Sequence, residues 1–391
     1  MAWGEQDSLV QRFEAVCECL HETCPHWSLG TSYDSWVTAH QREADRLIPA
    51  VTRKLRQHMQ SLVEHRTCGR WEAIAVDGSD AACPRTLANQ NAMGDTGKPD
   101  GIPQLSMTVL YHLGLGLPWA FRVGPSSESE RGHLRDMLDE LPSRSLLVAD
   151  AGFIGYDLCR EMIDKKQHFL LRVGGNVHLL NTLGYDYEID GETVYLWPVE
   201  QQDRREPPLK LRLIVIHEAD KQPVYLVTSV LDATQLTDEE AGEIYQQRWG
   251  IEVCYRTVKQ TLGHTCTRSR TPDNCYLEMT WALLGTWLLE LMTLREVIAA
   301  GGTPEQVSPA QARDAVRRAM RNASPKSRTN HSLWEVLANC RVDEYQRKKP
   351  KASRNYPRKK HQKPPKPPNI KSPTEKQVQL AQQLTPITLA L

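Results

Sequence analysis

The chain has 391 residues, of which 40% are hydrophobic and 25% are charged, a balance that is typical of folded protein and excludes wholesale disorder. Lys+Arg and Asp+Glu both number 48, yet residues 347–376 contain twelve of the cations and a single acid. Such a basic stretch is typical of polyanion contact, so the neutral total does not exclude a nucleic-acid partner. At ~150 residues per domain, two or three structural units are expected.

The sequence predicts a cytoplasmic protein without a membrane span. The longest uncharged apolar run, residues 279–289, is shorter than the ~20 residues that cross a bilayer. The first ten residues lack a basic segment followed by an apolar one, so no secretory signal is expected. Ten dispersed cysteines are expected to be mostly reduced. Cysteines and histidines also gather within residues 17–26, but without a CxxC pair, and incidental thiols near a helix end are favoured over a zinc site.

The elements up to residue 174 alternate between helix and strand. Residues 5–65 carry apolar positions at helical spacing and predict a helical N-terminal region. The elements that follow are strand 71–76, hairpin 105–123, helix 127–141, strand 145–150, helix 156–166 and strand 168–174. This order predicts an α/β unit.

The second half begins with strands and ends with helices. Thr237 precedes three acids, a negative first turn suited to a helix N-terminus, and helical periodicity continues to Gly263. The Pro-rich basic end should remain extended. The predicted organisation is a helical N-terminal region (1–68), a core in two parts (69–174 and 236–300), a β-rich insertion (175–235), a helical C-terminal region (301–346) and a disordered tail (347–391).

Four polar residues are predicted to share one face of the helix 237–263. At about 100° per residue, Tyr245, Arg248, Glu252 and Lys259 fall within an arc of about 60°, beside the apolar stripe. A solvated face with pairing between Arg248 and Glu252 is the alternative.

Two acids lie at the ends of predicted strands. Asp77 and Asp150 could each be an ordinary turn residue when considered alone. With Glu252 they form a set of three carboxylates that could hold one or two Mg²⁺ ions, while the Arg, Lys and Tyr of the helix could donate hydrogen bonds to phosphate oxygens. The set therefore indicates phosphodiester chemistry. Asp80 is an alternative ligand to Asp77.

The spacing Tyr245-x2-Arg248-x3-Glu252-x6-Lys259 resembles the YREK signature of the DDE transposases of bacterial insertion sequences, in the group called family four. The segment VDGSD at Asp77 resembles the first-aspartate segment of that family, and LVADAGFIG resembles the second. The resemblance covers roughly residues 71–263.

The resemblance implies an α/β fold of the RNase H-like type, a mixed sheet with flanking helices and a β-rich insertion before the glutamate helix. Asp77, Asp150 and Glu252 would be the catalytic residues and would bind two Mg²⁺ ions, for which Mn²⁺ could substitute. In addition, Tyr245, Arg248 and Lys259 would contact DNA phosphates.

The implied activity is that of a DNA transposase, which cleaves and joins DNA at insertion-sequence ends. Its partners would be double-stranded DNA, as terminal inverted repeats and target, and a second copy of the chain in a nucleoid-associated homodimer. The alternatives are an RNase H-like nuclease without strand transfer and a non-catalytic DNA-binding protein. The tail 347–376 would add sequence-independent phosphate contact or act only as a solvating extension.

Overall fold

The chain folds into two compact units. The computed structural model describes residues 1–28, 30–62, 67–93, 101–186, 188, 191–217, 222–321, 332–342 and 366–389. Unit 1 consists of Met1–Thr67, Val76–Met137 and Trp249–Val342, and unit 2 consists of Cys68–Ala75, Leu138–Arg248 and Asp343–Leu391. Strand β1 (Glu72–Ala82) passes from unit 2 into unit 1 after Ala75.

Unit 2 is built on a mixed sheet. The first half of β1 pairs in parallel with β4, and β4 pairs in parallel with β5. The remaining strands follow in the order β9-β8-β7-β6-β10, so the predicted β-rich insertion extends this sheet. The bounds are β4 (Ser145–Ala149), β5 (His168–Val173), β6 (His178–Leu180), β7 (Thr193–Leu196), β8 (Leu209–Ile216), β9 (Val224–Thr228) and β10 (Asn369–Lys371). All five residues of β4 are buried, as is typical of parallel strands, because the connecting helices cover both faces of such a sheet.

The helices of unit 2 are α5 (Tyr156–Asp164), α6 (Val199–Asp203), α7 (Asp238–Gln247) and α12 (Glu375–Ala381), with a 3₁₀ turn at Leu138–Glu140. The predicted start of α7 is confirmed, since Thr237 is its N-cap and forms a capping box with Glu240. The predicted disordered tail is wrong for residues 366–389. There β10 pairs with β6, and Thr374 caps α12. Residues 347–365 of that tail lie outside the described ranges.

Unit 1 combines a hairpin with a group of helices. Strands β2 (Gln104–His112) and β3 (Leu117–Pro125) pair antiparallel, and the hairpin turn places Gly116 at a φ of +64°, where glycine is unstrained. Its helices are α1 (Leu9–Thr23), α2 (Tyr33–Gln60), α3 (Leu87–Met93), α4 (Glu130–Met137), α8 (Gly250–Arg256), α9 (Pro272–Ala299), α10 (Pro309–Arg321) and α11 (Leu333–Ala338), with a π-helical turn at Thr257–Thr261 and a 3₁₀ turn at Pro304–Gln306.

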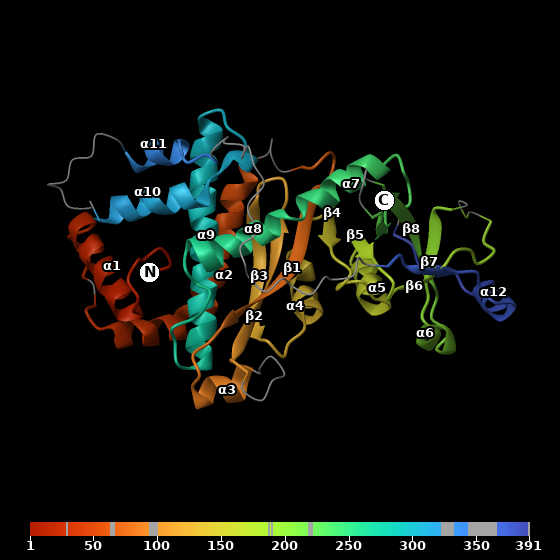
Figure 1. Cartoon of the computed structure of the whole chain (residues 1–391), viewed down its shortest axis with the longest axis horizontal. Helices are drawn as coiled ribbons and strands as arrows, with labels where there is room; N and C mark the ends of the chain where they lie inside the picture. Colours follow the sequence, from red (N-terminus) through yellow and green to blue (C-terminus); the bar gives the residue numbers. More distant parts are fainter. Residues whose placement is uncertain are drawn as a thin grey trace, which may run out of the picture. The chain divides into compact units, whose positions relative to one another are not determined.

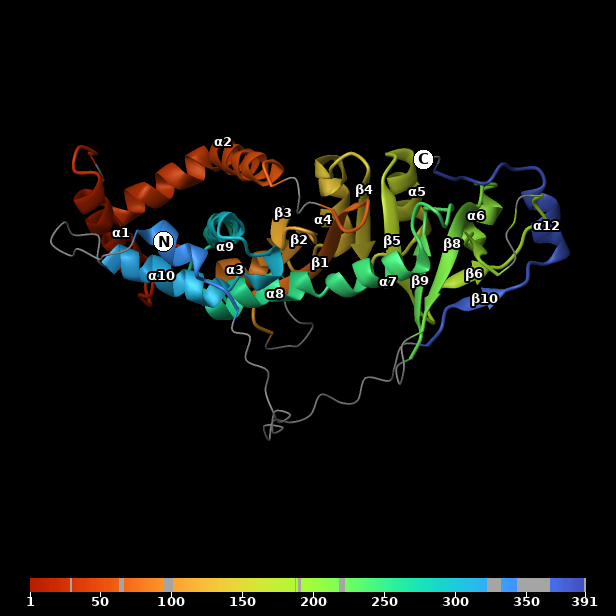
Figure 2. The same cartoon turned by 90° about the horizontal axis from the view of Figure 1, so that it is seen from above.

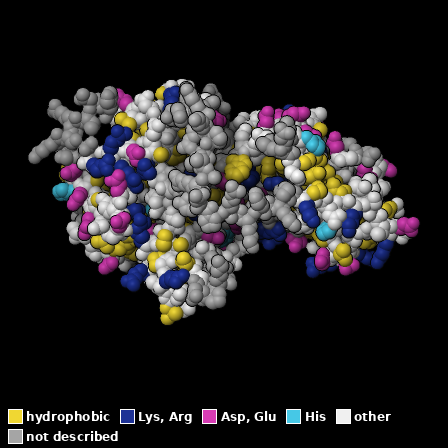
Figure 3. Space-filling model, in the orientation of Figure 1, with side chains coloured by type: hydrophobic (Ala, Val, Ile, Leu, Met, Phe, Trp, Pro, Cys, Tyr) yellow, Lys and Arg dark blue, Asp and Glu magenta, His cyan; other side chains and the backbone are white. Residues whose placement is uncertain are grey.

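Helix α9 forms the centre of unit 1. It packs against α2, α10, α11 and β3, and Figures 1 and 2 show it between α2 and α10. Half of its residues are buried, among them Trp287, because it is apolar around most of its circumference. Over α1 and α10, basic and acidic side chains intermingle (Figure 3), and Arg317 and Arg321 pair there with Glu5. None of the helices in the described ranges is long and apolar enough to cross a membrane.

The strand order confirms the predicted fold class. The order β3-β2-β1-β4-β5 places an acid on the first strand, an acid directly after the fourth, and the glutamate on a later helix, as in the RNase H-like fold that the resemblance implied. The chain is thus an α/β protein with a large mixed sheet and flanking helices.

Two local predictions are wrong. Strand β1 does not end before Asp77 but continues to Ala82, whose amide and carbonyl bond to Thr265 and Thr267. The helix 237–263 is not continuous either. It is interrupted at Arg248 and Trp249 and finishes in the π-helical turn, so a constant 100° per residue does not hold along it.

Candidate active site

An open groove on unit 1 contains two of the three predicted catalytic acids. It is lined by Asp77, Gly78 and Ser79 of β1 and by Glu252, Tyr255, Arg256, Lys259 and Gln260 of α8 and the π-helical turn. These segments are far apart in the sequence, and the packing of α8 against strand β2 of the hairpin brings them together.

Asp77 is held on both its main chain and its side chain. Its main-chain oxygen accepts a hydrogen bond from Tyr255 Oη at 2.6 Å, and its Oδ1 accepts one from the Gly78 N–H at 2.9 Å. A Cβ atom at Gly78 would lie 1.9 Å from Glu130 Oε1, so a larger residue there would require the Glu130 side chain to shift. The half-buried Asp77 carboxyl is thereby fixed at one wall of the groove.

Glu252 lies in the first turn of α8 with its carboxylate available. Among the described residues this carboxylate has no hydrogen bond and no ion pair. The helix is anchored by the buried side chains of Ile251, Cys254 and Tyr255. At Gly250 the helix approaches β2 closely, because a Cβ there would lie 2.9 Å from the Tyr111 ring. The packing therefore positions Glu252 without using its oxygens.

Lys259 faces β1 from the π-helical turn. Its ammonium donates to Ser79 Oγ at 2.7 Å and to the Asp80 main-chain oxygen at 2.5 Å. Burial lowers the pKa of Lys259, and the charge of Asp80 opposes this effect. An ammonium has three N–H donors, so one remains for a phosphate oxygen.

Tyr245 and Arg248 are together in unit 2, on α7 and at its C-cap. The Arg248 guanidinium carbon lies 5.6 Å from the centre of the Tyr245 ring, within cation–π range. The Tyr245 hydroxyl is buried and has no hydrogen-bond partner among the described residues. These two members of the predicted signature thus form a local pair.

Asp150 directly follows β4 in unit 2, as predicted. Its Oδ1 accepts a hydrogen bond from the Gly152 N–H at 2.8 Å, which is the turn geometry expected of an aspartate after a strand. Within the ranges that the structure describes, no three His, Cys, Asp or Glu side chains form a group that could hold a metal ion. Asp77 and Glu252 belong to unit 1 and Asp150 to unit 2.

Several groove residues were not predicted from the sequence. On the helical wheel Tyr255 belongs to the apolar stripe, and it is indeed buried, but its hydroxyl bonds to Asp77. The available signal was that a buried tyrosine hydroxyl requires a partner. Ser79, Arg256 and Gln260 also line the groove, and nothing in the sequence distinguished them from surface residues.

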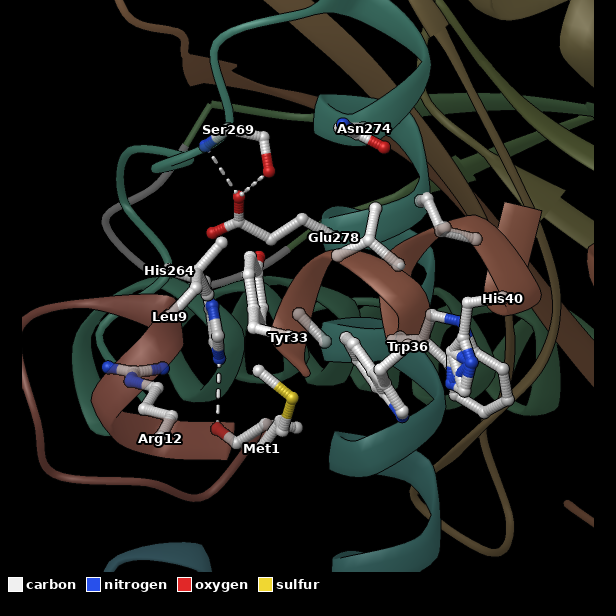
Figure 4. A pocket seen from close by; sticks show the side chains of 15 residues that line it. Met1, Leu9, Arg12, Tyr33, Trp36, His40, His264, Ser269, Asn274 and Glu278 are labelled. Carbon is white, nitrogen blue, oxygen red and sulfur yellow. Dashed lines mark hydrogen bonds between the residues drawn. The ribbon is translucent and has the colours of Figure 1, made fainter. Parts of the chain in front are cut away.

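A second pocket in unit 1 differs in character from the groove. Figure 4 shows its aromatic lining, which includes Tyr33, Trp36 and His40 of α2. Its carboxylate, Glu278, accepts hydrogen bonds from the Ser269 N–H and hydroxyl at 2.9 and 2.8 Å, which ties the preceding loop to α9. The pocket contains none of the six predicted site residues, and its carboxylate has a structural role.

The fold and the groove define an RNase H-like α/β protein with acids on β1 and on a helix that follows the sheet. Residues 71–288, more than half of the chain, match the family model described as the transposase DDE domain. The chain belongs to this family, which confirms the family that its motifs indicated.

Two curated relatives and one solved structure are similar to the chain. It is 26% identical over 263 residues to the transposase InsG for insertion sequence element IS4 of Escherichia coli (strain K12), covering 63% of this chain and 58% of that relative. It is 24% identical over 152 residues to the probable transposase for insertion sequence element IS5377 of Geobacillus stearothermophilus, covering 38% of this chain and 39% of that relative. The chain therefore spans less than two thirds of the length of these relatives. A cryo-EM structure of the piggyBac transposase synaptic complex with hairpin DNA is similar at a TM-score of 0.42 and 11% identity, covering 72% of this chain and 60% of that one.

Proposed function

We propose that this chain is a DNA transposase that cleaves and joins phosphodiester bonds at the ends of an insertion sequence. The observation that carries the proposal is the groove of unit 1, where Asp77 and Glu252 share one opening although they are far apart in the sequence. Family membership supports the same activity. Its substrates would be the terminal inverted repeats and a target, both double-stranded DNA, engaged by a homodimer.

Asp77, Asp150 and Glu252 are the residues that would hold the divalent cations, two Mg²⁺ ions or Mn²⁺ in their place. Their oxygens are the hard donors that Mg²⁺ prefers, and Mg²⁺ needs only one or two carboxylates because it keeps several waters. When bound, the cations would supply Lewis acidity at the phosphodiester.

The other side chains of the chain would bind and orient the DNA. The planar guanidinium of Arg248 can grip a phosphate through two parallel hydrogen bonds, and the stacked Tyr245 ring would restrict its orientation. Lys259 would offer its third donor to the phosphate while its other two remain on β1. These residues contribute charge neutralisation rather than proton transfer.

The test uses a supercoiled plasmid that carries the terminal inverted repeats, with Mg²⁺ and the full-length protein. Asp77→Asn, Asp150→Asn and Glu252→Gln should each reduce strand cleavage by more than about a hundredfold, because loss of a metal ligand should cost more than the roughly 10–100-fold typical of losing a residue that only holds a ligand in place. DNA binding, measured by gel shift in Ca²⁺, should remain within about threefold, since each change removes only one negative charge near the phosphates.

Asp80→Asn is the matched control, because the Asp80 side chain lies outside the groove lining while its main-chain oxygen holds Lys259. It should retain cleavage. An active Glu252→Gln enzyme would refute the assignment. Joining of a 3′-hydroxyl end to target DNA would distinguish a transposase from a nuclease. If the unaltered chain shows no Mg²⁺-dependent cleavage, only a DNA-binding role is left.

A further inference from the structure

We propose that Tyr255 is a positioning residue that sets the separation between Asp77 and Glu252, and this inference rests on the proposed function. The Tyr255 hydroxyl donates to the Asp77 main-chain oxygen at 2.6 Å and lies 3.3 Å from that of Met107. The residue is only 6% exposed. It therefore joins α8, β1 and β2 at one point beneath the groove.

The hydrogen bond acts on both carboxylates at once. Tyr255 follows Glu252 by three residues in α8, so the rigid helix turn transmits the position of its ring to the Glu252 side chain. At the other end, the Asp77 main chain is held by Tyr255 and the Asp77 carboxylate by the adjacent Gly78 N–H. The Asp77 carboxylate on β1 and the Glu252 carboxylate on α8 are thus linked through the Tyr255 hydroxyl.

The environment keeps this hydroxyl protonated. Burial raises the pKa of Tyr255 well above its ordinary value, and the nearby charge of Asp77 raises it further.

A second connection allows the inference to be tested without unfolding the site. Lys259, four residues after Tyr255, donates to Ser79 and Asp80 of the same strand. Removing the Tyr255 hydroxyl leaves this connection and the buried ring in place. Tyr255→Phe should therefore fold and loosen the groove at Asp77 only.

The experiment compares Tyr255→Phe with a matched tyrosine. Tyr156 is 7% exposed and donates to the Pro207 main-chain oxygen at 2.7 Å in unit 2, so Tyr156→Phe removes an equivalent hydrogen bond elsewhere. Mn²⁺ binding to the full-length protein without DNA is measured by electron paramagnetic resonance. Tyr255→Phe should weaken Mn²⁺ binding about tenfold, the smaller effect expected when a residue that only holds a metal ligand in place is lost, and Tyr156→Phe should not change it.

Cleavage at varied Mg²⁺ gives an independent readout. Tyr255→Phe should raise the half-saturating Mg²⁺ concentration about tenfold while the rate at saturation stays within about threefold, since excess Mg²⁺ restores occupancy. If Tyr255→Phe and Tyr156→Phe lower thermal stability equally and neither changes Mn²⁺ affinity, the hydroxyl has only a structural role and the inference is overturned.

Glu252→Gln identifies which proposal has failed. If it abolishes Mn²⁺ binding while Tyr255→Phe leaves binding unchanged, the proposed function stands and the role of Tyr255 is refuted. If Glu252→Gln and Asp77→Asn both bind Mn²⁺ normally, the metal assignment itself is wrong, and the inference falls with it.

Discussion

Two side chains form hydrogen bonds to β1. The hydroxyl of Tyr255 donates to Asp77, and the ammonium of Lys259 donates to Ser79 and Asp80. The motif spacing pointed to Glu252 and Lys259, and the position after a predicted strand pointed to Asp77; all three line the groove. Neither pattern could show these hydrogen bonds, because they depend on β1 continuing past Asp77 to Ala82. Sequence patterns therefore identified groove residues, whereas their partners required the three-dimensional packing.

Glu290 of α9 is a buried carboxyl that should make stability depend on pH. Burial raises its pKa from the usual 4.5 to about 8, although a hydrogen bond with Thr257 opposes the shift. Between these two values the folded protein keeps the proton that the unfolded chain has lost, so stability falls as pH rises through this window.

Glu290→Gln should remove this dependence, because an amide of the same shape does not ionise. The difference in free energy of unfolding between the variant and the unaltered protein should grow in favour of the variant by a few kcal/mol from pH 5 to pH 8. The slope is roughly 1.4 kcal/mol per pH unit for each proton by which the folded and unfolded states differ. Urea unfolding at several pH values in that range provides the measurement. A difference between the two proteins that is constant with pH would contradict the prediction.

At the scale of elements, the signature segment divides at Arg248 and Trp249 into α7 of unit 2 and α8 of unit 1. Composition favoured a single helix, since no proline interrupts it. The division accompanies a tertiary contact, the close approach of Gly250 to Tyr111, which no local pattern contains. The start of α7, in contrast, was predictable because capping depends only on neighbouring residues.

Thr237 should contribute to stability through its cap. Its hydroxyl accepts from the Glu240 N–H at 3.1 Å, and the Glu240 carboxylate accepts from the Thr237 N–H at 3.1 Å. Thr237→Ala should cost about 1 kcal/mol in free energy of unfolding, and Thr237→Ser should restore most of it. Denaturant titration followed by circular dichroism tests both. Equal losses in the two variants would show that the hydroxyl bond is unimportant.

At the scale of the whole molecule, the alternation of predicted strands and helices was enough to indicate an α/β unit, while the mixed sheet was implied by the family resemblance. The ordered segment after residue 365 was missed. Its Pro- and Lys-rich composition favours an extended chain, but Asn369–Lys371 pairs with β6 and Ile387 bonds to Pro208 and Lys210. Those partners are more than 150 residues away in the sequence, beyond the reach of any local pattern.

The basic residues 347–363 should determine part of the salt dependence of DNA affinity. Changing the Lys and Arg residues of this range to Gln, with residues 366–389 intact, should flatten the slope of log affinity against log salt by about 0.9 for each lost phosphate contact. Fluorescence anisotropy at varied NaCl measures the slope. A variant with the same residues in shuffled order should retain it, because such contact is independent of sequence. An unchanged slope in the Gln variant would exclude phosphate binding by this segment.

The discontinuous make-up of unit 1 has a consequence for the newly made chain. Asp77 leaves the ribosome well before Glu252, which at 5–20 residues per second means a delay of roughly ten to thirty-five seconds. During translation the hydrogen bond from Tyr255 to Asp77 can form only after α8 has been synthesised. The groove is therefore completed late in synthesis, and a nascent chain truncated before α8 would carry Asp77 without Glu252.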